Sequence, residues 1–99
     1  MSLPSIRDIP LGKLHLSIYD YAKAGDTLPM HQHDTTTEHA IIVARGRITL
    51  RVQDTTDGSI AESTHMAGAV IDTHAGWPHE IVGLDDGSRS IHIRKMYFA

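Results

Sequence analysis

The chain has 99 residues, of which 40% are hydrophobic and 21% are charged. This is the size of one domain, so we expect residues 1–99 to form a single domain with one core. Nine basic and twelve acidic side chains give a net charge of -3, and no Lys or Arg run could neutralise several phosphates, which argues against a nucleic-acid partner. The absence of cysteine excludes disulfides, Cys-based zinc sites and iron–sulfur clusters, so histidines and carboxylates are the strong metal ligands available.

Residues 1–13 contain two prolines and no continuous apolar stretch. This pattern predicts neither a signal peptide nor a membrane helix, and we therefore expect a cytoplasmic protein without a membrane partner. No glycine-rich loop precedes a helical segment, so no nucleotide cofactor is indicated.

Period-two alternation dominates the secondary-structure signal. Residues 14–19 and 47–52 alternate apolar with polar side chains, which predicts half-buried strands. Residues 39–43 form a short β-branched apolar run, and residues 90–97 read as a further strand. No window combines apolar positions at helical spacing with a cap, so no helix is expected. Short strands separated by Gly- and Asp-rich turns predict an all-β sandwich or barrel.

The same alternation gives an expectation for the histidines outside the motifs described below. His15 and His92 lie on the parity opposite to neighbouring leucines and isoleucines, so we expect both to face solvent. His65 is expected to lie in a turn.

Two segments carry histidines in a spacing that suits metal binding. His31 and His33 stand at i and i+2, so in an extended chain both side chains leave the same face. Far along the chain, His79 follows the segment Gly76-Trp77-Pro78, a turn that can aim it inward.

The first of these segments resembles the first motif of the cupin superfamily, which is a Gly, five residues, His-x-His, three or four residues, a Glu, six residues and a Gly. Gly25, the five-residue gap and the pair His31 and His33 match it. Counting forward from the pair places the acid of the motif at Glu38. Counting back from the closing glycine places it at His39.

The second segment resembles the second cupin motif, which is a Gly, five residues, Pro, any residue, Gly, two residues, His, three residues and Asn. Gly68, Gly76 and His79 keep this spacing. His74 replaces the proline and Gly83 replaces the asparagine.

The resemblance covers about residues 14–97 and implies a single-domain jelly-roll β-barrel. It also implies one divalent transition-metal ion in the barrel, held by His31, His33, His79 and one of His39 or Glu38. Fe, Mn, Zn, Ni and Cu all suit such ligands, so the sequence does not name the ion. A homodimer is implied as well, and short edge strands would be ready to pair across subunits.

Adjacent side chains on a regular strand face opposite sides, so Glu38 and His39 cannot both point inward. His39 shares its parity with Ile41 and Val43, which have the bulk expected of barrel-interior residues, and we favour it as the third ligand. A bulge within residues 35–37 would reverse the choice.

Two kinds of function are compatible with these residues. The first is a metal-dependent enzyme, a dioxygenase or isomerase, in which the ion activates dioxygen or polarises a carbonyl of a small organic substrate. The second is a non-catalytic module that binds or senses a small molecule or the metal. The substrate pocket is expected to involve Ile41, Val43, Trp77 and His74. No catalytic residue besides the metal ligands is indicated.

Overall fold

The structure, a computed structural model, describes residues 2–32, 37–73 and 76–96, and at residues 37–39 and 96 it describes the backbone alone. Nine strands are present in the described residues: β1 (Ser5–Leu11), β2 (Leu14–Tyr21), β3 (Thr27–His31), β4 (Thr37–Arg45), β5 (Arg47–Gln53), β6 (Ile60–Met66), β7 (Val70–Thr73), β8 (His79–Gly83) and β9 (Ser88–Met96). Within these residues, no helix is long and apolar enough to cross a membrane. The all-β expectation is confirmed.

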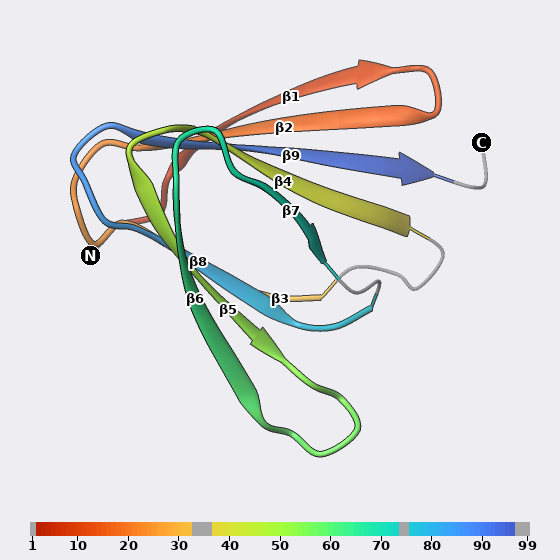
Figure 1. Ribbon diagram of the computed structural model, residues 1–99. Coiled ribbons are helices and arrows are strands. Elements are labelled where there is room, and N and C mark those ends of the chain that lie inside the picture. Colours follow the sequence, from red (N-terminus) through yellow and green to blue (C-terminus); the bar gives the residue numbers. More distant parts are fainter. Residues whose placement is uncertain (1, 33–36, 74–75, 97–99) are drawn as a thin grey trace.

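The strands form two antiparallel sheets that face each other (Figure 1). The five-stranded sheet has the order β1-β2-β9-β4-β7, and the four-stranded sheet has the order β3-β8-β5-β6. Figure 1 shows the sheets close together at one end and diverging towards the end that carries the β5–β6 turn. His31, at the end of β3, and His79, at the start of β8, both lie in the four-stranded sheet.

The segments expected to be strands correspond to β2, β4, β5 and β9. No strand was predicted for β1, which lies at the edge of the five-stranded sheet and contains Pro10. An edge strand tolerates proline because the N–H groups on its outer side have no ladder partner. His65 lies within β6 and not in a turn, so that expectation was wrong.

The core is formed by side chains from both sheets. Its fully buried apolar members are Tyr21, Ile41, Val43, Ile48, Leu50 and Ile81. Burying side chains of this kind contributes about 1.5–3 kcal/mol each. The core is tight at Gly83, because a Cβ atom there would lie 2.5 Å from the Cβ of Tyr21. A larger residue at this position would displace the tyrosine.

In β2 and β9 the buried face is the opposite of the expected one. Ser17, Ser90 and His92 are at most 2% exposed, whereas Leu14 is 40% exposed. His92 therefore faces the interior, and the expectation that it faces solvent was wrong. His15 is only partly exposed and contacts the Asp8 carboxylate at 3.2 Å.

A hydrogen-bond network explains how these polar side chains are accommodated inside. The Tyr21 hydroxyl lies 3.0 Å from Ser90 Oγ, and Ser90 Oγ lies 2.9 Å from His92 Nε2. The His92 ring also packs edge-on against Tyr19, with ring centroids 4.6 Å apart. Burying a polar group is costly mainly when it lacks a partner, so this network offsets the desolvation of β2 and β9.

Candidate metal centre

His31 and His79 meet across the pairing of β3 with β8. They are cross-strand partners, and the register shifts between Leu28 and His31. Such an irregularity re-aims the side chains that follow it. The two imidazole rings lie with their centroids 4.3 Å apart and their planes at 62°. Two stretches of chain separated by almost fifty residues thus bring their imidazoles into contact.

Both imidazoles are oriented by a hydrogen bond to the backbone two residues earlier. Nδ1 of His31 lies 2.8 Å from the carbonyl oxygen of Pro29, and Nδ1 of His79 lies 3.2 Å from that of Trp77. A carbonyl oxygen only accepts, so Nδ1 donates and carries the proton in both rings. The lone pair of each neutral ring is then on Nε2. Histidine ligands of metals are typically fixed through their other ring nitrogen in this way.

His79 is held in the protonation state that a metal requires. Its side chain is 2% exposed. Burial, reinforced by the nearby His31 and opposed by the hydrogen bond to the Trp77 carbonyl, lowers the pKa of His79 from 6.5 to about 4. The ring is therefore neutral at physiological pH, and a neutral imidazole is the form that binds metal ions.

The other residues proposed from the sequence are only partly described. His33 and His74 lie outside the described residues. For Glu38 and His39 the structure describes the backbone in β4, where His39 is the cross-strand partner of Thr73 and Arg94. The choice between Glu38 and His39 stays a prediction.

The preference for His39 over Glu38 assumed that position 39 lies on the same strand face as Ile41 and Val43, and the backbone register of β4 is relevant to that assumption. The pairing of β4 with β9 runs without a shift from Thr37 to Val43, and the irregularity falls between Val43 and Arg45. Ile41 and Val43, two and four residues after position 39, are fully buried. The described part of the strand therefore keeps position 39 on the parity of the core residues.

Among the side chains that the structure describes, no three His, Asp or Glu residues form a group that could hold a metal ion. The geometry of the described pair can still be tested against a metal. Metal–nitrogen bonds of about 2.0–2.1 Å place the centres of two imidazoles at right angles around one ion roughly 4.5 Å apart. The observed 4.3 Å between the rings of His31 and His79 is close to this value, so the pair fits a shared ion.

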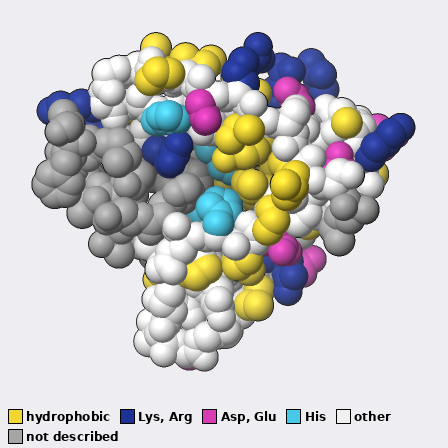
Figure 2. All heavy atoms as spheres, turned by 180° about the vertical axis from the view of Figure 1, so that it is seen from behind, with side chains coloured by type: hydrophobic (Ala, Val, Ile, Leu, Met, Phe, Trp, Pro, Cys, Tyr) yellow, Lys and Arg dark blue, Asp and Glu magenta, His cyan; other side chains and the backbone are white. Residues whose placement is uncertain are grey.

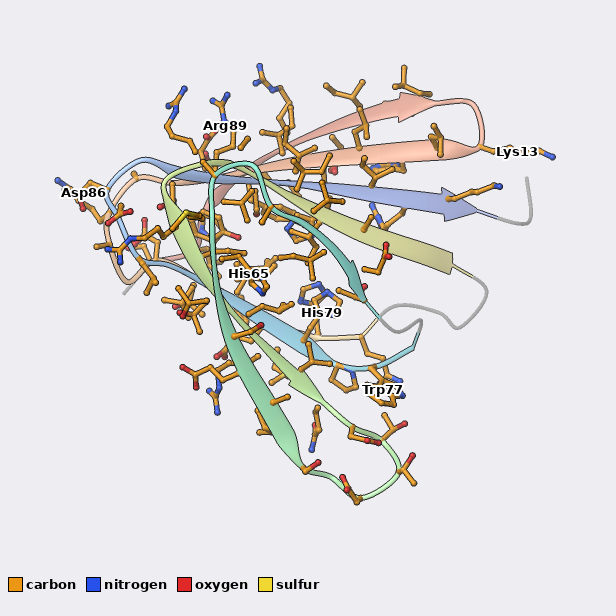
Figure 3. The ribbon with its side chains drawn as sticks, in the orientation of Figure 1. Lys13, His65, Trp77, His79, Asp86 and Arg89 are labelled. Atoms are coloured by element: carbon orange, nitrogen blue, oxygen red, sulfur yellow. The ribbon has the colours of Figure 1, made fainter. Side chains whose placement is uncertain are left out.

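His31, at the end of β3, and His79, at the start of β8, lie at the diverging end of the sheets. Figure 3 shows His79 between the two sheets and Trp77 farther towards the open end. Figure 2 shows histidine side chains around a hollow in one face of the molecule, with basic, acidic and hydrophobic side chains beside them.

A cavity of about 270 Å³ opens near these positions, lined by Val52, Asp54, Ser59, Ala61, Asp72, Thr73 and Trp77. Val52 is the cross-strand partner of His79, and Thr73 is the partner of His39. The cavity therefore adjoins candidate ligand positions on both sheets. Trp77 lines it, whereas Ile41 and Val43, also proposed for a pocket, are fully buried in the core.

Sequence reasoning missed Arg94. The register of β9 against its two neighbours places Arg94 opposite His15 on one side and His39 on the other. Arg94 is two residues after His92, so both side chains lie on the same face of the strand. The expectation that His92 faces solvent therefore placed Arg94 on the outer face as well. On the far side of His15, Asp8 accepts hydrogen bonds from Ser17 Oγ at 2.6 Å and from His15 Nε2 at 3.2 Å. These hydrogen bonds lower the pKa of Asp8 and keep its carboxylate charged.

Comparison with known proteins places the fold. No family model matches the sequence, and none of the curated proteins matches it. Among solved structures, an oxalate oxidase is 14% identical with a TM-score of 0.81, and the match covers 93% of this chain and 50% of that protein. The oxalate decarboxylase of Lactobacillus farciminis, in complex with formate, is 16% identical with a TM-score of 0.81, covering 100% of this chain and 30% of the other.

A structure of Bacillus subtilis oxalate decarboxylase, from a study of its Mn(II) centres, is 17% identical with a TM-score of 0.81. The match covers 100% of this chain and 27% of that protein. The chain thus spans half or less of the length of these structures. Oxalate oxidase and oxalate decarboxylase are cupin proteins. With its two antiparallel sheets and these matches over almost its whole length, the chain has the jelly-roll fold of the cupins.

Proposed function

We propose that this chain is a metal-binding cupin that holds one divalent transition-metal ion. The proposed ligands are His31, His33, His39 and His79, with Glu38 as the alternative to His39. One observation carries the proposal: the rings of His31 and His79 lie 4.3 Å apart, and both donate Nδ1–H to a backbone carbonyl. Mn stands beside Fe, Zn, Ni and Cu as a candidate ion, with support from the Mn(II) centres of the similar B. subtilis protein.

The proposed substrate is a small organic acid. A bound ion would act as a Lewis acid towards an oxygen of the substrate, or activate dioxygen. An all-imidazole ligand set leaves the charge of the ion uncompensated, which favours an anionic substrate. Arg94 does not line the cavity described above; it stands opposite position 39 in the sheet, and its Nη2 donates to Ser17 Oγ at 3.4 Å. Its guanidinium group would bind a carboxylate of a substrate that reaches from the cavity past position 39. The names of the matched proteins, which act on the small dianion oxalate, support the same class of substrate.

The cavity beside the candidate ligands would take such a molecule. Its volume of about 270 Å³ suits a compact compound and not a polymer. Val52, Ala61 and Trp77 offer apolar contacts, and Ser59 and Thr73 offer hydroxyl groups. We propose a metal-dependent oxidoreductase of the dioxygenase type, or an isomerase, as the enzymatic function.

The alternative is a non-catalytic module that binds or senses a small acid or the metal itself. Both functions use the same ligands and the same cavity, so they differ in turnover and not in binding. We propose a cytoplasmic homodimer in either case.

Binding and turnover can be measured separately because Trp77 is the only tryptophan of the chain and lines the cavity. We expect at least one acid from a panel of small mono- and dicarboxylates to change the Trp77 fluorescence of the Mn(II)- or Fe(II)-loaded protein. Arg94→Gln should weaken this binding about 10- to 100-fold, the effect of losing a charge-assisted hydrogen bond. Oxygen uptake or product formation with the same acid would identify an enzyme, and binding without turnover would identify the module.

Arg89→Gln is the matched control for this experiment. Arg89 lies in the same strand on the other face (Figure 3). There its guanidinium binds the Asp20 carboxylate at 2.6 Å. Its loss should leave acid binding unchanged. A panel that leaves Trp77 fluorescence unchanged with every acid and both ions would contradict the proposed substrate class.

A further inference from the structure

The charged residues at the wall of the cavity beside the candidate metal ligands are acidic. Asp54 and Asp72 both line it, and none of the described lining residues is basic. The cavity therefore does not suit a ligand with a carboxylate at each end, because the carboxylate inside it would lie beside a like charge. A ligand with a negative charge at its other end alone is compatible with these walls.

Strand alternation distinguishes the two aspartates. Asp72 directly follows Ile71, whose cross-strand partner Ile41 is fully buried. Adjacent side chains face opposite sides of a strand, so the exposed Asp72 side chain points away from the core. Asp54 comes two residues after Val52, which packs against the core, and so it lies on the inner side. The carboxylate inside the cavity is therefore that of Asp54.

Asp54 is held in place at the base of the turn between β5 and β6. Its backbone N–H donates to the carbonyl oxygen of Ser59 at 2.8 Å, and its carbonyl oxygen accepts from the N–H of Gly58 at 2.8 Å. Its Oδ1 accepts a hydrogen bond from the backbone N–H of Thr56 at 2.7 Å. A carboxylate has two oxygens with several acceptor positions, so this bond orients the group and leaves capacity for a ligand.

Trp77 gives the same cavity an aromatic wall. The N–H of Gln53, the residue before Asp54, donates to the carbonyl oxygen of Pro78 at 2.9 Å. This bond joins the segment that carries Trp77 to the end of β5, and Figure 3 shows Trp77 beside that end. An aromatic ring attracts a cation to its face, and a carboxylate accepts charge-assisted hydrogen bonds from an ammonium group. The two side chains together suit an amine.

The groups that would attract a negative charge lie to one side of the cavity. Thr73 lines the cavity and is the cross-strand partner of His39, which in turn is the partner of Arg94. These three positions form one row across β7, β4 and β9, in which neighbouring strands lie about 4.8 Å apart. The row leads from the cavity, past a candidate metal ligand, to a guanidinium group. Opposite charges therefore attract the two ends of a ligand in this row.

We propose that the ligand of this site is a small zwitterion, a carboxylic acid that also carries an amine, and that its ammonium group binds between the Asp54 carboxylate and the Trp77 ring. The inference rests on the proposed function, which places the carboxylate of the ligand at the metal ion or at Arg94. It narrows the small organic acids to amino acids. The cavity volume of about 270 Å³ has room for the amine-bearing half of such a molecule.

Three acids of matched chain length test the proposal by titration of the full chain, followed through Trp77 fluorescence. They are γ-aminobutyrate, pentanoate and glutarate, which end in an ammonium, a methyl and a carboxylate group. We expect γ-aminobutyrate to bind the Mn(II)-loaded protein at least about 10-fold more tightly than either of the others, the effect of one charge-assisted hydrogen bond. The preference over pentanoate should persist in the metal-free protein, because Asp54 and Trp77 do not depend on the ion.

Variants at position 54 show whether that carboxylate makes the difference. Asp54→Asn keeps an acceptor for the Thr56 N–H but removes the charge, and it should reduce the preference for γ-aminobutyrate over pentanoate to less than about threefold. Asp54→Lys should reverse the order and favour glutarate. Glu62→Gln is the matched control, because Glu62 lies on the outer side of the same sheet, 3.9 Å from Arg51, and its loss should leave the preference unchanged.

The outcomes separate this inference from the proposed function. Equal affinities for γ-aminobutyrate and pentanoate, or a preference that survives Asp54→Asn, would overturn the inference and leave the proposed class of small acids in place. Absence of binding by all three acids would overturn that class, and the inference with it.

Discussion

His79→Ala is expected to lower the affinity of the protein for a divalent transition metal by at least about 100-fold. Loss of a partner that merely orients a ligand costs 10- to 100-fold in affinity, and loss of the ligand itself should cost more. The imidazole of His79 is buried, neutral and in contact with that of His31. Metal titration, with elemental analysis of the purified protein, should give one ion per wild-type chain and much less than one for the variant.

His92→Gln is the matched control for His79→Ala. His92 and His79 are both 2% exposed, and both lie inside the fold. His92 is bound to Ser90 and packs on Tyr19, so its replacement should cost stability but leave metal affinity unchanged. Equal loss of metal from both variants would mean that the effect of His79→Ala comes from the fold and not from a ligand.

The same titration assigns the third ligand. His39→Ala should lose the ion and Glu38→Ala should retain it, because position 39 keeps the parity of Ile41 and Val43 in an unshifted register. The opposite outcome would move the assignment to Glu38.

Without metal, the protein is expected to lose roughly 3 kcal/mol of its unfolding free energy through His79 as the pH falls from 6.5 to 4. The pKa of His79 is lowered from 6.5 to about 4 in the folded state, mainly by burial. The unfolded chain therefore takes up a proton first, and protons favour unfolding throughout this window. The contribution is fully present above pH 6.5 and lost as the pH approaches 4. Urea unfolding of the metal-free protein across this range measures it.

A His79→Asn variant separates this contribution from other titrations. It carries no titrating ring at position 79, so its stability should fall much less between pH 6.5 and 4. The carboxylate of Asp8, whose pKa is lowered by its hydrogen bonds with Ser17 and His15, titrates below this window. Parallel stability curves for the wild type and the variant would show that the His79 ring is not held neutral by the fold.

Local patterns were sufficient to predict the all-β fold and several strands. The alternation in β5 also predicted the buried side correctly, because Ile48 and Leu50 lie in the core. The motif spacing named His31 and His79, which the structure brings into contact. Each of these predictions rests on residues close together in sequence or on two segments with a fixed internal spacing.

The alternation in β2 and β9 could not reveal which face is buried. Period two says which side chains share a face, but the choice of the inner face depends on what the rest of the chain supplies. Here Tyr21, Ser90 and His92 form hydrogen bonds with one another inside the fold. These bonds offset the desolvation of the polar side chains on the interior face. The cavity, and the position of Arg94 between His15 and His39, depend on how distant strands pair. A local sequence pattern does not predict that pairing.

The most direct test of the metal centre is a crystal structure of the protein loaded with Mn(II) or Zn(II). We expect one ion bonded to Nε2 of both His31 and His79, with further protein ligands from His33 and from position 39 or 38. An ion bound elsewhere, with the Nε2 atoms of His31 and His79 bonded to no metal, would contradict the account.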